Sequence, residues 1–299
     1  MEDRKQLLLE KLKLEILEKQ KVIEEISNHT EELETLREVR ARVNAKGKTI
    51  KYLTGYKAID DEMGGFSEGS FINIAGSNFS GKTSLVLKII ENIALHNRTV
   101  FFSYEMYENL LVTNKLRNTK IDENLVIVQK KNNLIDIELI IRNEYKKGVK
   151  FFAIDSMMKI RVLEKMQDHQ KVSLISATLS KLTQELGVII MLINQVSLTD
   201  IRDKRLEFKG SGDVSYDSDV SLFITVDEKD DSRLLHCKKD RINERIWKSD
   251  ITDNSYIKNA IEKNYNNKGY SNRKQFSNEP VETTAYEMSG NLDIPDIEF

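Results

Sequence analysis

The stretch FINIAGSNFSGKTSL, residues 71 to 85, decides the fold that the sequence predicts. An apolar run comes first, the pattern Gly-x-x-x-x-Gly-Lys-Thr extends from Gly76 to Thr83, and a helical pattern follows to about Leu95. Backbone N–H groups of such a loop, and of the helix after it, cradle phosphate groups that the glycines allow to approach closely. The stretch therefore predicts a strand, a phosphate-binding loop and a helix, in that order.

The loop also predicts the ligand, a nucleoside triphosphate, and ATP is the preferred choice. Lys82 would neutralise charge on the β- and γ-phosphates, and Thr83 would ligate Mg²⁺. The residues expected to bind the nucleotide are Gly76, Ser77, Asn78, Phe79, Ser80, Gly81, Lys82, Thr83 and Ser84.

Polar residues follow three other apolar runs. Glu105 comes after VFFSY, Asp155 ends KFFAID, and Gln195 comes after VIIMLIN. Ligands of an open parallel sheet bind outside the carboxyl ends of its strands, so these side chains should converge on one nucleotide. We predict that Asp155 holds Mg²⁺, that Glu105 is the general base for water, and that Gln195 senses the γ-phosphate or holds a water. A helix N-cap for Asp155 and a turn for Gln195 are the alternatives.

The pattern around these motifs predicts the fold class. Apolar runs alternate with helical stretches, and strands buried on both faces indicate a mainly parallel α/β sheet. The runs expected to form it are residues 71–76, 99–104, 125–129, 150–155 and 188–194. Two later runs, 220–226 and 233–238, flank DEKDDS and predict an added hairpin.

The two flanks differ from this core, which is expected to span residues 47–253. Residues 1–46 contain no proline and no glycine, and their charged, 3-4 spaced pattern predicts one long helix. We expect it to contact another subunit, as a coiled coil or a packed helix; contact with its own domain is the alternative. Residues 254–299 are rich in Asn, Lys and Ser and predict a disordered tail.

Composition restricts the class of protein. The chain has 299 residues, a net charge of −2 and a 39% hydrophobic fraction, which fits one large domain with appendages. Its single cysteine, Cys237, excludes an internal disulfide framework and fits a reducing compartment. No window approaches the roughly 18 apolar residues of a membrane span. We expect a cytoplasmic protein without a membrane partner, from a bacterium or a phage-infected cell.

Several of these stretches resemble one family. LTGYKAIDDEMGGFSEGSFINIAGSNFSGKTSL is similar to the start of the ATPase core in the RecA superfamily. VFFSYEM resembles the strand that carries the catalytic glutamate in DnaB-type replicative helicases, and LINQVS and GSGDVSYDSDVSLFI resemble further DnaB-type segments. The resemblance spans roughly residues 50–250 and implies a RecA-like P-loop core.

The resemblance also implies a site shared between subunits. HCKKDRIN (236–243) resembles the Lys-x-Arg element that reaches the γ-phosphate of the neighbouring subunit in this family. Carried over by position, Lys239 would be the lysine sensor and Arg241 the arginine finger. The glycine that usually follows is replaced here by Ile242 and Asn243.

Two further segments suggest partners. In the family, the loops after Asp155 and Gln195 face single-stranded DNA in a central channel, and binding of this kind is electrostatic. The candidate contacts in the second loop are Arg202, Lys204, Arg205 and Lys209, although solvated surface loops are the alternative. The last residues, LDIPDIEF, resemble the acidic, Phe-terminated tips of bacterial single-stranded DNA-binding proteins and predict a protein partner.

Three functions remain open at this point. The first is an ATP-hydrolysing motor of the DnaB type, a homo-oligomeric and expectedly hexameric ring that translocates on single-stranded DNA. The second is a recombination ATPase of the RecA or RadA type that forms filaments on DNA. The third is an ATP-dependent loader or mediator that organises replication partners.

Overall fold

A computed structural model of the chain describes residues 2–27, 34–47, 49–163, 166–195, 217–227 and 230–252. Its main sheet has eight strands within these ranges. They are β3 (Phe71–Gly76), β4 (Thr99–Ser103), β5 (Leu125–Val128), β6 (Phe151–Asp155), β7 (Ile189–Ile193), β8 (Val220–Val226), β9 (Arg233–Asp240) and β10 (Trp247–Asp250). A separate small sheet pairs β1 (Lys51–Tyr52) with β2 (Phe66–Ser67).

The order of strands across the main sheet is β10-β9-β8-β3-β7-β6-β4-β5. The six strands from β8 to β5 are parallel to their neighbours, whereas β9 and β10 are antiparallel additions at one edge. The predicted α/β class, the mainly parallel sheet and the late hairpin are therefore confirmed. The third strand of that edge, β10, was not predicted, because its four residues WKSD lack an apolar run.

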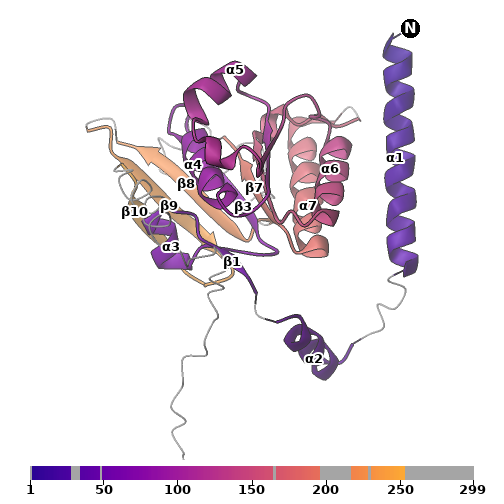
Figure 1. The fold of residues 1–299 in the computed structure, drawn as a ribbon, viewed down its shortest axis with the longest axis horizontal. Coiled ribbons are helices and arrows are strands. Elements are labelled where there is room, and N and C mark those ends of the chain that lie inside the picture. Colours follow the sequence, from indigo (N-terminus) through magenta and orange to yellow (C-terminus); the bar gives the residue numbers. More distant parts are fainter. Residues whose placement is uncertain are drawn as a thin grey trace, which may run out of the picture.

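Helices cover both faces of the sheet (Figure 1). The α-helices of the described residues are α1 (Glu2–Ser27), α2 (Leu36–Lys46), α3 (Lys57–Met63), α4 (Lys82–Ala94), α5 (Glu108–Leu110), α6 (Leu134–Lys146) and α7 (Asp168–Leu186). Shorter turns of π- or 3₁₀-helix occupy Leu111–Lys115, Thr119–Ile121 and Met157–Lys159.

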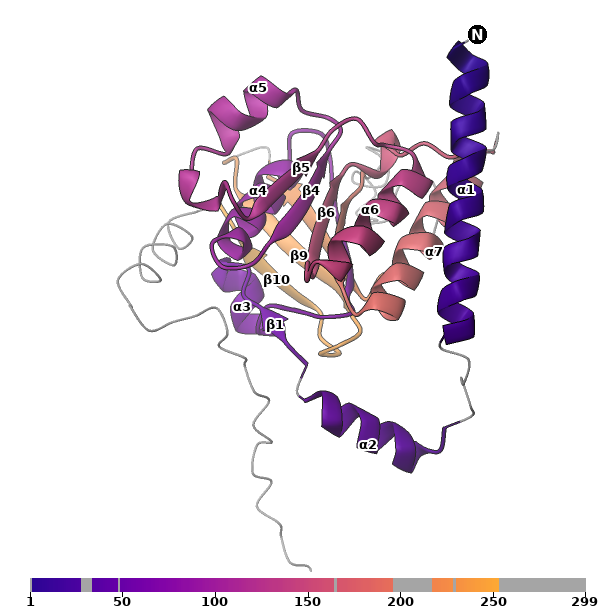
Figure 2. The ribbon, with the colours of Figure 1, turned by 45° about the vertical axis from the view of Figure 1, so that its right-hand side comes forward.

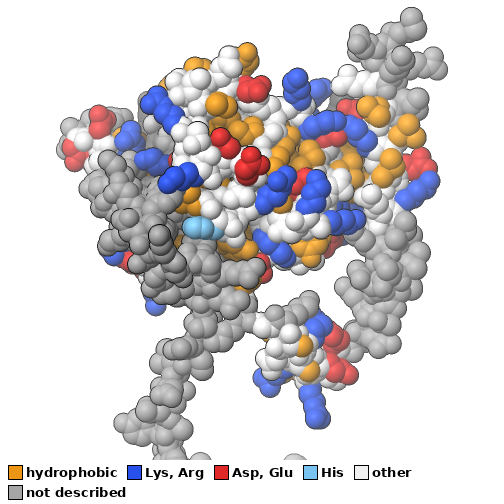
Figure 3. Space-filling model, in the orientation of Figure 1, with side chains coloured by type: hydrophobic (Ala, Val, Ile, Leu, Met, Phe, Trp, Pro, Cys, Tyr) orange, Lys and Arg blue, Asp and Glu red, His pale blue; other side chains and the backbone are white. Residues whose placement is uncertain are grey.

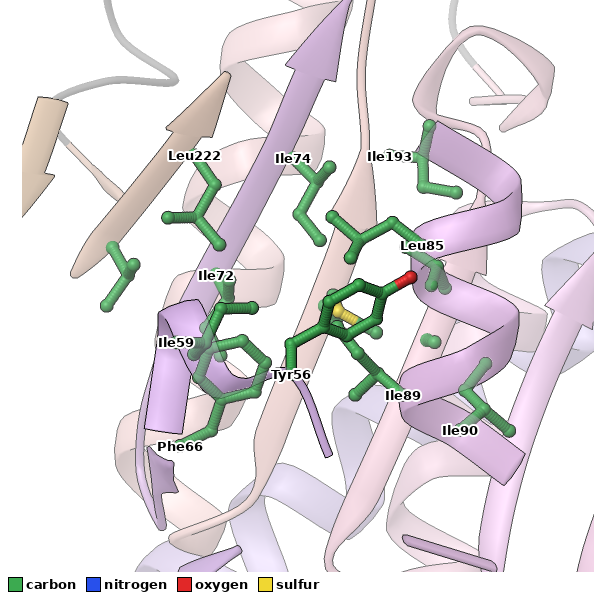
Figure 4. Close-up of a cluster of buried hydrophobic side chains, with 14 of the residues drawn as sticks. Tyr56, Ile59, Phe66, Ile72, Ile74, Leu85, Ile89, Ile90, Ile193 and Leu222 are labelled. Atoms are coloured by element: carbon green, nitrogen blue, oxygen red, sulfur yellow. The ribbon is translucent and has the colours of Figure 1, made fainter. Parts of the chain in front are cut away.

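Successive side chains along each strand point to opposite faces of the sheet, and the core is therefore divided into two clusters. On β4, Phe101 packs with α3 and α4, whereas Val100 and Phe102 pack with α6 and α7, and all three are fully buried. Figure 4 shows the first cluster, in which Leu85 and Ile89 of α4 lie over the branched side chains of the central strands. Burial on both faces explains why these strands read as continuous apolar runs.

The N-terminal region forms two helices, so the expectation of one helix over residues 1–46 is wrong. Thr35 has an extended backbone and begins α2 with a capping box, in which its side chain accepts from the Glu38 N–H and the Glu38 carboxylate accepts from the Thr35 N–H. A capping box satisfies backbone donors that only a helix start leaves open. Residues 28–33, between the two helices, lie outside the described residues.

Helix α1 lies along α6 of the same chain (Figure 2). Leu17 is buried there, Lys13 donates to Asp136 at 2.7 Å, and Lys21 lies 3.1 Å from Glu138. Contact with its own domain, the alternative weighed above, thus occurs within the single chain. A contact of this region with another subunit stays a prediction.

The segment before the core is held by one carboxylate. Asp60 of α3 accepts hydrogen bonds from the N–H and hydroxyl of Thr54, both at 2.8 Å, and from the Gly55 N–H at 2.9 Å. Burial raises the pKa of Asp60 to about 6, although the hydrogen bonds from Thr54 and Gly55 oppose that shift. The turn at 54–55 is thereby tied to α3, which leads into β2 and β3.

The other predicted flank, residues 254–299, lies outside the described residues. Among the residues that the structure does describe, no helix combines the length and the apolar character needed to cross a bilayer.

Asp60→Asn should make the stability of the chain depend less on pH. The folded pKa of about 6 exceeds the ordinary value of 3.8, so the contribution of Asp60 is complete below pH 4 and is lost as the pH rises through 6. The free energy of unfolding of the wild type should fall relative to the variant by up to about 3 kcal/mol between pH 4 and pH 7. Urea unfolding at both pH values measures this, and a constant difference would contradict it.

Candidate active site

The phosphate loop joins β3 to α4 at the centre of the sheet. A Cβ at Gly76 would lie 2.5 Å from the Ser80 hydroxyl and 2.7 Å from the Ile224 carbonyl oxygen, so only glycine fits there. Gly81 precedes α4 with a φ of 98°, in the left-handed region that glycine tolerates best. Close contacts at Gly76 and the backbone conformation at Gly81 thus explain both glycines of the motif. The loop between them leads directly to the N-terminus of α4.

Lys82 points back into this loop. Its ammonium group donates to the carbonyl oxygens of Gly76 at 3.1 Å and Ser77 at 2.6 Å. Burial lowers the pKa of Lys82, while the nearby carboxylates of Asp155 and Glu105 act in the opposite direction. A phosphate chain in the loop would offer this ammonium group charged acceptors, which make stronger hydrogen bonds than carbonyls do.

Thr83 and Asp155 form a contact suited to a divalent cation. The Thr83 hydroxyl donates to Asp155 Oδ2 at 2.8 Å, and Asp155 is 1% exposed. Burial raises the pKa of Asp155 to about 6; the Thr83 hydroxyl and Lys82 oppose this, and the Glu105 carboxylate adds to it. Asp155 Oδ1 is buried without a hydrogen-bond partner in the described residues. A hydroxyl beside a carboxylate with a spare oxygen fits Mg²⁺, which prefers oxygen ligands.

Glu105 lies beside this pair, just beyond the end of its strand. Strand β4 ends at Ser103, and Glu105 is exposed, so its charge carries no burial cost. Its carboxylate accepts a short hydrogen bond from the Ser156 hydroxyl, and the Tyr104 N–H donates to the Asp155 carbonyl at 2.8 Å. Since β4 and β6 are neighbours, these contacts hold Glu105 next to Asp155 at the carboxyl edge.

Gln195 reaches the same edge from β7, the strand between β3 and β6. Its N–H donates to the side-chain oxygen of Asn194 at 2.8 Å, and Asn194 is fully buried. Four sequence-predicted features, namely the loop, Glu105, Asp155 and Gln195, therefore meet at one edge of the sheet, as the parallel topology requires.

Lys239 and Arg241 lie at the opposite edge. Strand β9 starts at the carboxyl end of β8 and runs antiparallel to it, so that Lys239 pairs with Ser221 near the amino end. At about 3.3 Å per residue, Lys239 is roughly 20 Å along β9 from Arg233. Arg241 follows the strand and lies 3.3 Å from Asp219. The fold does not bring these two residues to the phosphate loop of their own chain.

Some predicted residues are not described, and two useful ones were not predicted. Arg202, Lys204, Arg205 and Lys209 lie outside the described residues. Ser156, the partner of Glu105, directly follows Asp155 and could have been inferred from that adjacency. Arg233 approaches Gly81 from β9, and no local pattern indicates this, because the contact depends on the register of the hairpin.

Comparisons with known proteins show which proteins this chain is similar to. Residues 52–126 match the family model described as the DnaB-like helicase C-terminal domain. Over 245 residues the chain is 25% identical to the replicative DNA helicase DnaB of Treponema pallidum, covering 68% of this chain and 54% of that protein. It is 27% identical over 214 residues to a probable plasmid replicative DNA helicase of Chlamydia muridarum, covering 57% and 46%.

The resemblance to the ATPase core of DnaB-type helicases is confirmed. The fold agrees as well. A DnaB-like replicative helicase, solved to show its interactions with primase, superposes with a TM-score of 0.60 at 19% identity, covering 83% of this chain and 73% of that one. A KaiC-like protein of Pyrococcus horikoshii gives 0.52 at 17%, covering 68% and 94%. The predicted RecA-like P-loop fold is thus confirmed, and the chain spans about half the length of the DnaB-type relatives it matches.

Gly76→Ala should disrupt the phosphate loop. The added methyl group would overlap the Ile224 carbonyl, which is main chain and cannot rotate away. We expect a loss of about 1 to 3 kcal/mol in the free energy of unfolding and a strong loss of affinity for ATP. Urea unfolding and equilibrium binding of ATP measure the two effects.

Gly148→Ala is the matched control for this substitution. Gly148 has a positive φ of 92° and open space around its Cβ position, so alanine there should cost backbone strain alone and leave ATP binding intact. Wild-type affinity for ATP in Gly76→Ala would contradict the steric account of the loop.

Proposed function

We propose that this chain is an ATP-hydrolysing motor of the DnaB type that translocates on single-stranded DNA. Its relatives are named replicative DNA helicases, and the structural neighbour that covers 83% of the chain is a DnaB-like replicative helicase. The chain itself offers a phosphate loop with two carboxylates beside it. These features support nucleotide binding and hydrolysis as the source of energy for translocation.

Different residues of the site bind the nucleotide and activate the water that attacks it. Lys82 and the loop N–H groups would bind the phosphates, and Thr83 Oγ1 and Asp155 would hold Mg²⁺. When bound, that ion neutralises charge on the phosphate oxygens. Glu105 takes a proton from the attacking water at a carboxylate oxygen, while the Ser156 hydroxyl orients the carboxyl group.

The separation between two parts of the site supports an assembly of several copies of the chain. The Lys-x-Arg pair and the phosphate loop lie at opposite edges of one sheet, separated by most of the length of β9. A single chain cannot bring them together, whereas a second copy packed head to tail can present its Lys239 and Arg241 to the first. Repetition of such a heterologous contact produces rings or filaments. We propose a ring of six copies.

The DNA contacts are proposed for the segment after Gln195. Arg202, Lys204, Arg205 and Lys209 would track the phosphate backbone there, with the salt sensitivity typical of such binding. On the face drawn in Figure 3, basic side chains lie among acidic and hydrophobic ones.

Further partners follow from the same proposal. The acidic tip at residues 292–299 would dock a replication partner through Phe299, and the N-terminal region would contribute to assembly. A motor that acts on replicating DNA would work in the bacterial cytoplasm.

Unwinding of forked DNA tests the proposed function. The wild-type chain with ATP and Mg²⁺ should displace one strand of a fork that has a single-stranded tail. Glu105→Gln should bind ATP with affinity close to wild type but lose at least about a hundredfold in hydrolysis, as expected for removal of a general base. It should not unwind the fork.

The other outcomes identify the alternatives. ATP hydrolysis without unwinding, together with helical filaments on single-stranded DNA, would replace the motor by a recombination ATPase. Hydrolysis by a chain that neither requires nor binds DNA would favour a loader. Normal hydrolysis by Glu105→Gln would show that the base has been assigned to the wrong residue.

Mixed oligomers test whether the site is shared. Lys82→Ala removes the loop lysine and Arg241→Ala removes the finger, so each variant alone should have little ATPase activity. A mixture restores some intact sites, because the wild-type loop of one variant can meet the wild-type Arg241 of the other. At an equal ratio, about a quarter of the interfaces should be intact if the two variants mix at random.

The control for this mixture is the double variant with both substitutions. Mixed with either single variant, it should restore no activity, because no interface then combines an intact loop with an intact finger. ATPase activity of the Lys82→Ala and Arg241→Ala mixture that stays at the level of the separate variants would contradict action across the interface.

A further inference from the structure

We propose that Arg233 binds the phosphate chain of the nucleotide, in the same chain as the loop. This inference rests on the proposed function, in which the loop holds ATP. It adds a cation that comes from the β8–β9 hairpin, a part of the fold outside the loop motif and outside the Lys-x-Arg pair.

The sheet topology brings Arg233 to the loop. Gly76, the last residue of β3, pairs with Ile224 of β8, and β8 continues to Val226 at the same edge. The chain then reverses, and β9 begins at Arg233, which pairs with Val226. Arg233 therefore lies at the carboxyl edge of the sheet, with only β8 between its strand and β3, whereas Lys239 of the same strand lies at the far edge.

The side chain is in contact range of the phosphate loop. A Cβ built at Gly81 would lie 3.6 Å from Arg233 Nε and 3.7 Å from its Cδ. Gly81 is the N-cap of α4 and directly precedes Lys82. The N-terminus of a 13-residue helix carries partial positive charge and open N–H groups, which favour an anion at this point.

The backbone of Arg233 is held on both sides. Its N–H donates to the Thr252 hydroxyl at 2.7 Å, and its carbonyl accepts from the Ile251 N–H at 2.8 Å. Ile251 is itself buried in the core. The side chain thus starts from a fixed position, so its direction toward Gly81 is a property of the fold.

One N–H donor of the Arg233 guanidinium group is unsatisfied in the described part of the chain. Arg233 Nε is buried and has no hydrogen-bond partner among the described residues. A buried, unsatisfied donor on a charged group is unfavourable unless a ligand satisfies it. The planar guanidinium group matches the geometry of phosphate oxygens. The phosphate chain, rather than the base, is the anionic part of ATP that can meet this need.

Equilibrium binding of ATP, ADP and AMP to the full chain tests the proposal. Arg233→Ala should weaken ATP binding at least about tenfold, the effect of removing one charge-assisted hydrogen bond. The loss should be larger for ATP than for AMP, because more phosphate charge is then unpaired. Arg233→Lys should recover part of the affinity through its charge.

Two comparisons make this test specific. Lys238→Ala removes an exposed cation from the same strand and should leave all three affinities unchanged. Lys82→Ala should abolish ATP binding and provides the reference for a lost phosphate contact. A thermal melt without nucleotide should give the same midpoint for Arg233→Ala as for the wild type, within a few degrees.

The contrary outcomes separate this inference from the proposed function. If the wild type binds ATP and Arg233→Ala binds it equally well, the inference is wrong and the proposed function stands. Equal losses for ATP, ADP and AMP, or a large drop in the melting midpoint, would assign Arg233 a structural role and overturn it. A wild-type chain that fails to bind ATP would overturn both.

Discussion

A hydrogen bond from the Thr83 hydroxyl to Asp155 connects two parts of the sheet that are not neighbours. Thr83 stands on the helix that follows β3, Asp155 ends β6, and β7 lies between those strands. The bond is 2.8 Å long and is buried at the Asp155 end. It fixes the N-terminus of α4, and with it the phosphate loop, relative to β6 and its carboxylate.

The buried and incompletely paired charges at this edge favour the binding of a ligand. Burial raises the pKa of Asp155 to about 6 and lowers the pKa of Lys82, so each group is less easily charged than it would be in water. Burial of incompletely paired charge is costly, and it persists in proteins mainly where function requires it. A divalent cation beside Asp155 and phosphates beside Lys82 and Arg233 would supply the missing partners. We therefore infer that a bound nucleotide with its cation would pair these charges.

Much of this arrangement could be predicted from the sequence. The apolar runs located β3, β4 and β6 to within a residue, and parallel topology required their carboxyl ends to meet. What could not be predicted depends on long-range register. The approach of Arg233 to Gly81 needs the β8–β9 pairing, and the exposure of Glu105 depends on where β4 ends. The separation of α1 from α2 is not predicted by helix periodicity, because the signal for it is local, a capping box between Thr35 and Glu38.

We propose that the catalytic site is complete only between two copies of the chain. Specific ATPase activity, measured over a dilution series in parallel with molecular mass by analytical ultracentrifugation, tests this most directly. Activity per chain should rise with the assembled fraction and disappear as the monomer becomes the main species. Full activity per chain in a solution of monomers would contradict it.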